Sequence, residues 1–485
     1  MPETIHDHLV RLVVPFDFKC GITKARSIVE HSGSWKVDKP KPKDLFLHIK
    51  SLISGESAAE TIGYRNILDR DPQSPEIFPL LADTVIELRK KEPEGPGSDD
   101  FSINFTIPAI RLYLFETGVG FFVVDIRYCN PRSLCAVARG NFYLKKIGIR
   151  KDDCTYSHTD PVDNTIIVED EFPGISFIRK MATDFGEFSF FERKNDFPRH
   201  CLVFTYLILD QIEKNPEKRI QFIEKSLFRL SKGWHCNYYP PLEKNESDNN
   251  PALLNFVDNI YWGVTLEGCA NISYFTHDGS PDHFVSEILP GRIQESYFYL
   301  YILALVQRFS LLILAQRTGK IPLNAGQSMQ KLPADSGALK EIRLLQKDIP
   351  FYGLRINFSQ VSHNLHYTLF YEKLKDVYRV DHLFNELDTE VKNLGAVLDQ
   401  FDALEKSEKE QKQKNIELWI AVAAIIFAIA SVLSDGLGFL SYMKWFDEKC
   451  PIVSLGWVLG FIIVLFFIAR SILKNTAFFS GKNGK

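Results

Sequence analysis

The stretch LWIAVAAIIFAIASVL, from Leu418 to Leu433, opens the most apolar part of the chain, and a second apolar run, IVSLGWVLGFIIVLFFIA, extends from Ile452 to Ala469. Because a helix rises about 1.5 Å per residue, roughly 20 residues span a bilayer core. The second run approaches this length alone, and the first reaches it with its flank up to Leu440. Backbone groups in lipid must be satisfied within the segment, which favours helices. We predict two membrane-spanning helices; a buried hairpin of a soluble domain is the alternative, although neither run has a polar face.

The charges that flank the two runs predict how they cross the membrane. Lysine is dense in KSEKEQKQKN at 406–415, and lysine and arginine recur at 470–485. The connecting turn at 441–451 balances two lysines with two acids. Because cytoplasmic flanks carry the excess of lysine and arginine, we expect a multi-pass protein of the inner (cytoplasmic) membrane with both termini in the cytoplasm. The N-terminal sequence has no apolar signal-peptide core, so we expect insertion by the C-terminal hairpin.

Composition indicates a globular chain of more than one domain. Its 485 residues exceed one ordinary domain, and 45% apolar with 24% charged residues is typical of a packed protein. The formal net charge of −4 gives no reason to expect nucleic acid as a partner. None of the eight cysteines forms a C-x-x-C pair, and no cysteine–histidine cluster has zinc spacing. We therefore predict reduced thiols and no metal site.

The residues before the membrane runs predict a mixed α+β domain. Five stretches have strand patterns: 8–19 (a first or edge strand), 102–107, 109–128 (a hairpin that turns at Glu116-Thr117-Gly118), 175–180 and 259–276. The stretch 201–212 fits a strand or a helix. Strands and helices do not alternate regularly, which favours α+β over a doubly wound sheet.

From Asp282 the pattern becomes helical. A third membrane helix at 297–314 competes here with a buried core helix. Gln307 and Arg308 lie in its middle, and a charge at mid-bilayer costs several kcal/mol. We therefore predict a buried helix, in which Arg308 needs a partner and a buried ion pair is the expected one.

A heptad seam precedes the first membrane run. Its apolar residues recur at spacings of four and three: Val380, Phe384, Leu387, Val391, Leu394, Leu398 and Phe401. The seam predicts a long stalk helix over 359–415 that packs against a partner. If it continues into the first membrane run, it forms one rod of about 110 Å. Self-association of stalks and an intrachain helical bundle both explain the seam.

These patterns divide the chain into consecutive segments. They are an α+β sensing domain (1–280), a helical connector (281–358), the stalk helix (359–415), membrane helix one (416–440), an external turn (441–451), membrane helix two (452–474) and a cytosolic tail (475–485).

This plan resembles the CorA family of divalent-cation channels and transporters. The resemblance covers mainly 280–475 and rests on the architecture and on two helical stretches, YLYILALVQRFSLLILAQR (299–317) and HLFNELDTEVKNLGAVLDQF (382–401). It implies an α/β cytosolic domain, a stalk helix, two C-terminal membrane helices and a pentamer whose first membrane helices line a pore. The lipid bilayer and further copies of this chain are then the expected partners.

The sequence departs from that family at its filter. The family's Gly-Met-Asn should follow the first membrane helix, where this chain has Ser434-Asp435-Gly436-Leu437-Gly438. This departure and the long N-terminal part are similar to the CorA-like membrane effectors of type III CRISPR antiviral defence. Those proteins are thought to answer a nucleotide second messenger, an adenosylmethionine–AMP conjugate, by perturbing the membrane. The alternatives are a magnesium or other divalent-cation transporter and a membrane-anchored binding protein or scaffold without a pore.

No enzyme constellation is present, since the chain has no P-loop, G-x-S-x-G or H-E-x-x-H motif. We expect no enzyme, no catalytic residue and no cofactor; a divalent cation and a nucleotide messenger are the expected ligands. The pore candidates are polar residues of the first membrane helix and its entrance: Asn415, Ser431, Ser434 and Asp435. A ring of Asp435 carboxylates would select cations, whereas a helix-terminating Asp before Gly explains the residue equally well. Serines also pack helices together.

The candidates for binding an anionic ligand are basic residues near aromatic ones, because guanidinium groups bind phosphates through paired hydrogen bonds. They form two clusters: Arg193, Lys194, Asp196, Arg199 and His200 in FERKNDFPRH; and Lys145, Lys146 and Arg150. In IYWGVTLEG, Trp262 is a candidate to stack on a base and Glu267 a candidate to hydrogen-bond it. A solvated surface explains both clusters, and a core tryptophan at a strand end explains Trp262.

Overall fold

The computed structural model describes residues 4–32, 35–37, 42–54, 61–66, 84–90, 101–131, 133–146, 154–159, 164–173, 175, 178–179, 200–240, 251–276, 282–319, 337–355, 357–442 and 460. The chain divides into two compact units, Met1–Val397 and Leu398–Lys485. The described strands are β1 (Ile5–Asp17), β2 (Trp35–Val37), β3 (Thr61–Asn66), β4 (Ile86–Lys90), β5 (Phe101–Phe115), β6 (Val119–Tyr128), β7 (Cys154–Thr159), β8 (Ile166–Glu169), β9 (Leu202–Leu209), β10 (Ala252–Val257), β11 (Ile260–Thr265) and β12 (Gly268–Tyr274). The described helices are α1 (Ile22–His31), α2 (Leu47–Ser54), α3 (Leu134–Leu144), α5 (Pro216–Lys232), η1 (Phe284–Ile288), α6 (Leu289–Arg292), η2 (Ile293–Tyr297), α7 (Phe298–Gly319), α8 (Gly337–Arg355), α9 (Leu365–Val377) and α10 (Val380–Tyr442).

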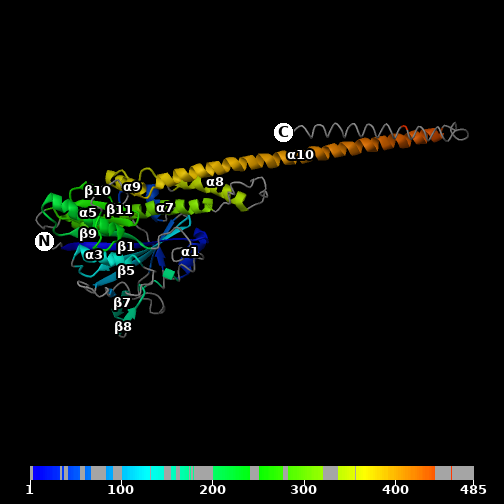
Figure 1. Cartoon of the computed structure of the whole chain (residues 1–485). Helices are drawn as coiled ribbons and strands as arrows, with labels where there is room; N and C mark the ends of the chain where they lie inside the picture. The colour runs from blue at the N-terminus through cyan, green and yellow to red at the C-terminus, as the bar shows by residue number, and fades with distance from the viewer. Residues whose placement is uncertain are drawn as a thin grey trace. The chain divides into compact units, whose positions relative to one another are not determined.

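In the described part of the first unit, one twelve-stranded sheet runs in the order β10-β11-β12-β9-β1-β6-β5-β4-β7-β8, with β3 also on β5 and β2 on β3 (Figure 1). This confirms the mixed α+β prediction. β12 and β9 are parallel, and the other recorded pairs are antiparallel. β1 was expected first or at an edge; it is first in the chain, but it lies centrally between β6 and β9.

The β5–β6 hairpin is confirmed where the sequence places it. Gly118 has a φ of 83°, which glycine adopts without a Cβ clash, and its N–H donates to Phe115 O at 3.0 Å. Earlier in β5, the register with β6 shifts between Thr106 and Ala109. Pro108, which has no N–H for the ladder, lies in that shift. The two halves of β5 pair with different strands, β4 and β3.

Two helical layers cover the sheet. Val10 and Leu12 of β1 belong to the same buried cluster as Leu227 of α5. Because side chains alternate along a strand, Arg11 points to the other face. There its guanidinium lies 4.1 Å from the ring centre of Phe298 in α7.

α7 is the predicted core helix. Within Phe284–Gly319, which is long and apolar enough to cross a membrane, 78% of the apolar window is buried inside the protein. Gln307 donates to the Tyr371 hydroxyl of α9. Arg308 Nη1 donates to Tyr378 O at 2.8 Å, so its partner here is a backbone carbonyl and not the expected carboxylate.

The secondary structure of two stretches, 175–180 and 201–212, differs from the prediction or resolves an ambiguity in it. The stretch 175–180 was expected to be a strand, but its described residues Ile175, Ile178 and Arg179 are helical. The ambiguous stretch 201–212 contains strand β9, whose eight residues are all buried. A continuous apolar run of this length fits a strand covered on both faces.

The stalk does not begin at 359 as predicted. α9 ends at Val377, and α10 begins at Val380 after Arg379, whose φ of 54° lies in the left-handed region. α10 then runs for 63 residues, about 95 Å at 1.5 Å per residue. The chain therefore has a sharp break where the sequence pattern predicts continuity.

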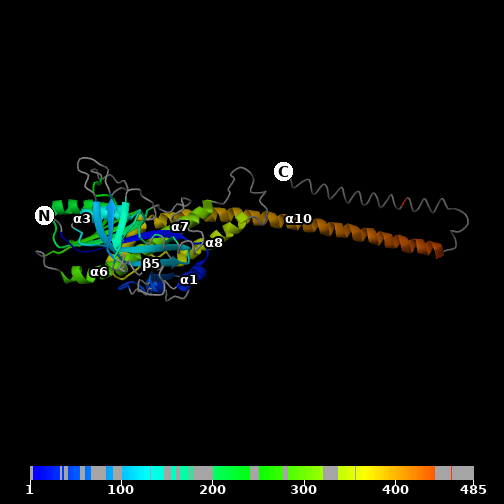
Figure 2. The same ribbon diagram turned by 90° about the horizontal axis from the view of Figure 1, so that it is seen from below.

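The first part of the heptad seam packs inside its own chain. Val380, Leu387 and Leu394 are buried, and the ring of Phe384 lies 5.8 Å from that of Tyr352 in α8. In both views α7, α8 and the first turns of α10 run side by side (Figure 1 and Figure 2). This is the intrachain packing that one explanation of the seam predicts, whereas self-association stays a prediction.

In the second unit, the described part of α10 carries exposed apolar side chains. Phe427 is 76%, Trp419 66% and Ile420 64% exposed. The helix over Val380–Ser431 is the second one long and apolar enough to cross a membrane, with none of its apolar window buried. The predicted first membrane helix is thus a candidate span. Of the predicted turn at 441–451, only Ser441 and Tyr442 are described, and they still belong to α10. Of the predicted second membrane helix only Gly460 is described, and it is helical.

Candidate functional site

The structure describes only some of the residues predicted to bind a ligand. Arg150, Arg193, Lys194, Asp196 and Arg199 lie outside the described residues. The others, Lys145, Lys146, His200 and Trp262, are in the first unit.

Lys145 anchors the best-defined polar site. It follows α3 directly, and its side chain is 5% exposed. Its ammonium donates to Glu267 Oε2 at 3.1 Å and to Lys232 O at 2.8 Å. Glu267, in the turn between β11 and β12, also accepts from Trp234 Nε1 at 3.1 Å. Two residues named from sequence, Lys145 and Glu267, therefore meet, as an ion pair.

Of the first predicted basic cluster only His200 is described, and its backbone lies close to Lys145 of the second cluster. The N–H of Cys201, which directly precedes β9, donates to Lys145 O at 2.8 Å. His200, the last residue of the first cluster, is therefore next in the chain to a residue bonded to the second. Lys146 extends the site, with its ammonium 4.0 Å from the ring centre of Phe142.

The site holds more positive than negative charge. Lys232 is only 5% exposed, and its ammonium lies 4.8 Å from the ring of Phe228 and 4.7 Å from that of Trp234. Burial lowers the pKa of both Lys145 and Lys232, while the attraction of Glu267 opposes the shift. Two largely buried ammonium groups thus share the charge of one carboxylate, an arrangement that favours an additional anion.

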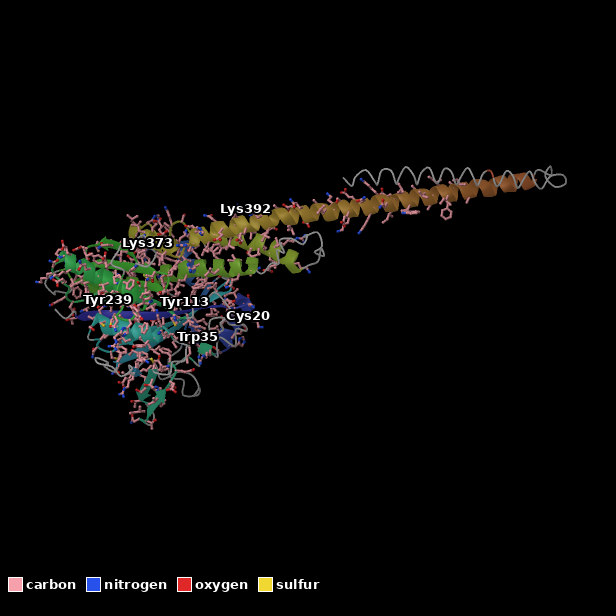
Figure 3. The ribbon with its side chains drawn as sticks, in the orientation of Figure 1. Cys20, Trp35, Tyr113, Tyr239, Lys373 and Lys392 are labelled. Atoms are coloured by element: carbon pink, nitrogen blue, oxygen red, sulfur yellow. The ribbon has the colours of Figure 1, made fainter. Side chains whose placement is uncertain are left out.

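α5 contributes further cations that we did not identify from sequence. Lys225 lies 4.2 Å and Arg229 5.0 Å from the ring of Tyr239, which is 64% exposed and labelled in Figure 3. Arg229 also donates to Tyr238 O at 3.0 Å. The sequence does contain a pattern that could have identified them. Lys225, Arg229 and Lys232 are spaced by four and three residues, which places their side chains on one face of a helix.

We call this set the basic–aromatic cluster: Lys145, Lys146, Lys225, Arg229, Lys232, Trp234, Tyr239 and Glu267. Its cations suit phosphate oxygens, and an exposed tyrosine offers a surface on which a planar base stacks. The arrangement therefore suits a ligand that is both anionic and aromatic.

Trp262 lies elsewhere, in the core. It is fully buried, and its ring centre is 4.6 Å from Phe370 and 4.7 Å from Tyr297. The structure thus matches the core-tryptophan interpretation, and no ligand reaches this ring without displacing its neighbours.

The proposed pore residues all lie on α10. The side chains of Asn415 and Ser431 are exposed. α10 continues through Ser434 and Asp435 to Tyr442. The explanation of Asp435 as a residue that terminates the helix is therefore wrong. Positions 431 and 435 are four apart and therefore share a helix face.

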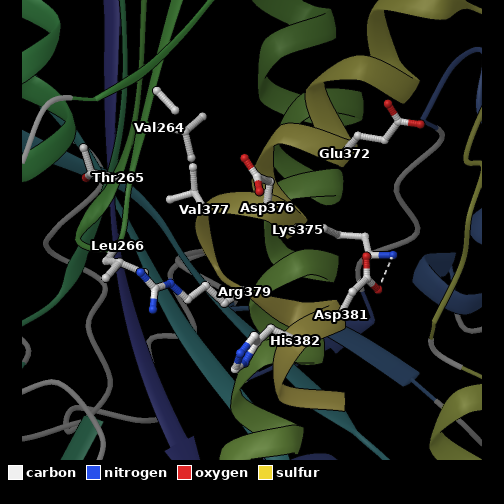
Figure 4. Close-up of a pocket in the computed structure, with 11 residues that line it drawn as sticks. Val264, Thr265, Leu266, Glu372, Lys375, Asp376, Val377, Arg379, Asp381 and His382 are labelled. Atoms are coloured by element: carbon white, nitrogen blue, oxygen red, sulfur yellow. Dashed lines mark ion pairs between the residues drawn. The ribbon is translucent and has the colours of Figure 1, made fainter. Parts of the chain in front are cut away.

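A cavity of about 600 Å³ surrounds the break before α10 (Figure 4). Strands β10 and β11 form one wall, and the end of α9 with the start of α10 forms the other. The ammonium of Lys375 lies 2.9 Å from Asp381 Oδ1 across the break. Acidic Glu372 and Asp376 lie opposite basic Arg379, so the lining favours neither charge.

In the chain that the structure describes, no three His, Cys, Asp or Glu side chains gather in a way that could hold a metal ion. Comparisons of this chain with protein-family models, with curated proteins and with solved structures give no significant match.

Proposed function

We propose that this chain is an oligomeric membrane effector whose N-terminal domain binds an anionic, nucleotide-like messenger at the basic–aromatic cluster. The observation that carries the proposal is the largely buried Lys145–Lys232 pair, which shares one carboxylate. On the same helix as Lys232, Lys225 and Arg229 contact the exposed ring of Tyr239. Phosphates would complete the charge balance, and Tyr239 would stack on a base. The adenosylmethionine–AMP conjugate expected from the CorA-like effectors has both chemical features.

α10 supplies the membrane part of the proposal. It is one helix that carries buried seam residues near its start and exposed apolar residues after Ile416. In an oligomer, Ser431 and Asp435 would face a common axis and select cations. Ligand binding would act by shifting the population between a closed and an open arrangement of these helices. Antiviral defence through membrane perturbation would follow from that opening.

The test begins with binding to the full chain in nanodiscs. Calorimetry with the adenosylmethionine–AMP conjugate, ATP and AMP should give saturable binding to at least one of them. Lys232→Met should weaken that binding at least tenfold, since it removes a charge contact of about 1.4 kcal/mol or more. Lys218→Met, an exposed lysine near the start of the same helix, is the matched control and should bind normally. Equal binding by both variants would reject the site.

Ion flux separates the remaining functions. Liposomes that hold the full chain should release ions only when the nucleotide is present, and Asp435→Asn should change the cation preference. Magnesium flux without any nucleotide, together with rescue of a magnesium-uptake-deficient host, would favour the divalent-cation transporter instead. Nucleotide binding without flux would favour a membrane-anchored binding protein.

A further inference from the structure

Two π-helical turns shape a second cavity, distant in sequence from the basic–aromatic cluster. η1 and η2 flank the single turn of α6 in one continuous helical stretch. π-turns widen a helix locally and recur at functional sites. Here Phe284, Leu289, Arg292 and Tyr297, drawn from all three turns, line one groove of about 420 Å³.

The other walls of the groove are mostly apolar, with Asn255 and His366 as their polar members. Phe256, Val257 and Ile260 come from the β10–β11 hairpin, and Leu365 and Leu369 come from the start of α9. Leu365 is 69% exposed, Val257 50% and Leu369 37%. The volume lies within the range of small-molecule sites.

Arg292 gives the groove its charge. Its Nε is buried and has no hydrogen-bond partner in the described chain. The carboxylate of Asp44 lies 3.8 Å from Nη2, which is beyond hydrogen-bonding distance. Burial, followed by the charge of Arg292, lowers the pKa of His366, so this histidine is neutral near pH 7. The groove thus offers one guanidinium whose buried Nε donor lacks an acceptor in the described chain, in mostly apolar surroundings.

We propose that this groove binds a small amphiphilic acid. Its single anionic head would take the free donor capacity of Arg292, and its alkyl chain would cover Phe284, Leu365 and Leu369. Charge complementarity supports this occupant: an acid would add a second anion to a guanidinium whose recorded carboxylate partner, Asp44, lies 3.8 Å away. An alcohol would bring no charge, and an alkylammonium would be repelled by the guanidinium. The proposal goes beyond the nucleotide site and does not depend on it.

Trp262 provides a local readout, because its ring lies 4.7 Å from that of Tyr297 in the groove wall. The full chain in phosphatidylcholine nanodiscs is titrated with ω-bromooctanoate, whose bromine quenches nearby tryptophan fluorescence. Subtracting the signal of Trp262→Phe removes the contribution of the other tryptophans and of probe dissolved in lipid. ω-Bromooctanol and ω-bromooctylammonium are the neutral and cationic comparison probes.

Saturable quenching of Trp262 by ω-bromooctanoate is expected, with half-saturation at least tenfold below that of the alcohol or the ammonium. Arg292→Met should erase that preference. Leu365→Glu, at an exposed position where folding is preserved, should weaken binding of the acid at least tenfold. Leu344→Glu on α8, also at an exposed leucine, should leave binding unchanged. Equal quenching by all three probes, or binding of the acid that survives both Arg292→Met and Leu365→Glu, would overturn the proposal.

Discussion

Replacing Glu267 with glutamine should lower the stability of the protein and strengthen its binding of anions. The carboxylate accepts from Lys145 Nζ and Trp234 Nε1, each at 3.1 Å. Glutamine keeps an oxygen acceptor but removes the charge that balances two ammonium groups. The two effects have opposite signs, which distinguishes this substitution from a general weakening of the fold.

The size of both effects follows from the contacts. A hydrogen bond to a charged group contributes about 1.5–3 kcal/mol. The Glu267 side chain is 43% exposed, and solvent screens exposed pairs, so we expect a loss of about 1–2 kcal/mol in the free energy of unfolding. Removing one negative charge beside a bound anion should raise nucleotide affinity about threefold to tenfold, which is roughly 0.7–1.4 kcal/mol.

The assay is a double-mutant cycle on the full chain. Urea titrations of the wild type, Glu267→Gln, Lys145→Met and the double variant should give a coupling energy of about 1–2 kcal/mol. Glu287→Gln removes an exposed acid that lies 3.3 Å from His283, and this control should change stability by less than about 0.5 kcal/mol. A coupling energy near zero, or weaker nucleotide binding by Glu267→Gln, would refute the reasoning.

Three further predictions concern other parts of the chain. Burial lowers the pKa of His8 from 6.5 to about 4, so the unfolded state takes up a proton at a higher pH than the folded state does. About 3 kcal/mol of stability that is present above pH 6.5 is therefore lost as the pH falls from 6.5 through 4. In urea titrations His8→Gln should lose less stability at acid pH than the wild type, and an equal loss would contradict this prediction. Gly268→Ala places a Cβ against backbone oxygens of β9 and α5 and should cost about 1–3 kcal/mol, whereas Gly291→Ala, with nothing within 4 Å, should not; equal urea midpoints would count against the close approach. Phe427→Lys should reduce recovery in the membrane fraction, because a central lysine costs about 3 kcal/mol on insertion; Ala403→Lys, outside the apolar run, is its control, and equal recovery of both would argue against a membrane span.

Local patterns sufficed for the elements whose partners are near in sequence. The β5–β6 hairpin turns at Gly118 as predicted. The helix α7 is buried inside the protein, as we predicted from Gln307 and Arg308 in the middle of its apolar run. The position of β1 was not predictable, because its neighbours are set by pairing with strands far along the chain. The break at Arg379 was missed, since a non-glycine residue with positive φ leaves no local signal.

The candidate site was predictable in part. Lys145 and Glu267 were both named, but their pairing joins positions 122 residues apart, which no local spacing encodes. Lys225, Arg229 and Lys232 had a helical spacing that sequence reading could have used. For Trp262 the sequence could not distinguish two roles. An aromatic residue at a strand end fits a ligand-binding surface and a protein core equally well until its neighbours are known.

The central place of β1 has a consequence for the order of biosynthesis. Val10 pairs with Thr205, so β1 leaves the ribosome about 195 residues before its second neighbour. At roughly 5–20 residues per second this wait lasts about 10 to 40 s, during which one edge of β1 lacks its strand and is open to chaperones. The last strand in the part of the chain that the structure describes, β12, ends at Tyr274, well before Leu418 is translated. The sheet can therefore close on the nascent chain before the targeting machinery meets the first apolar run of α10.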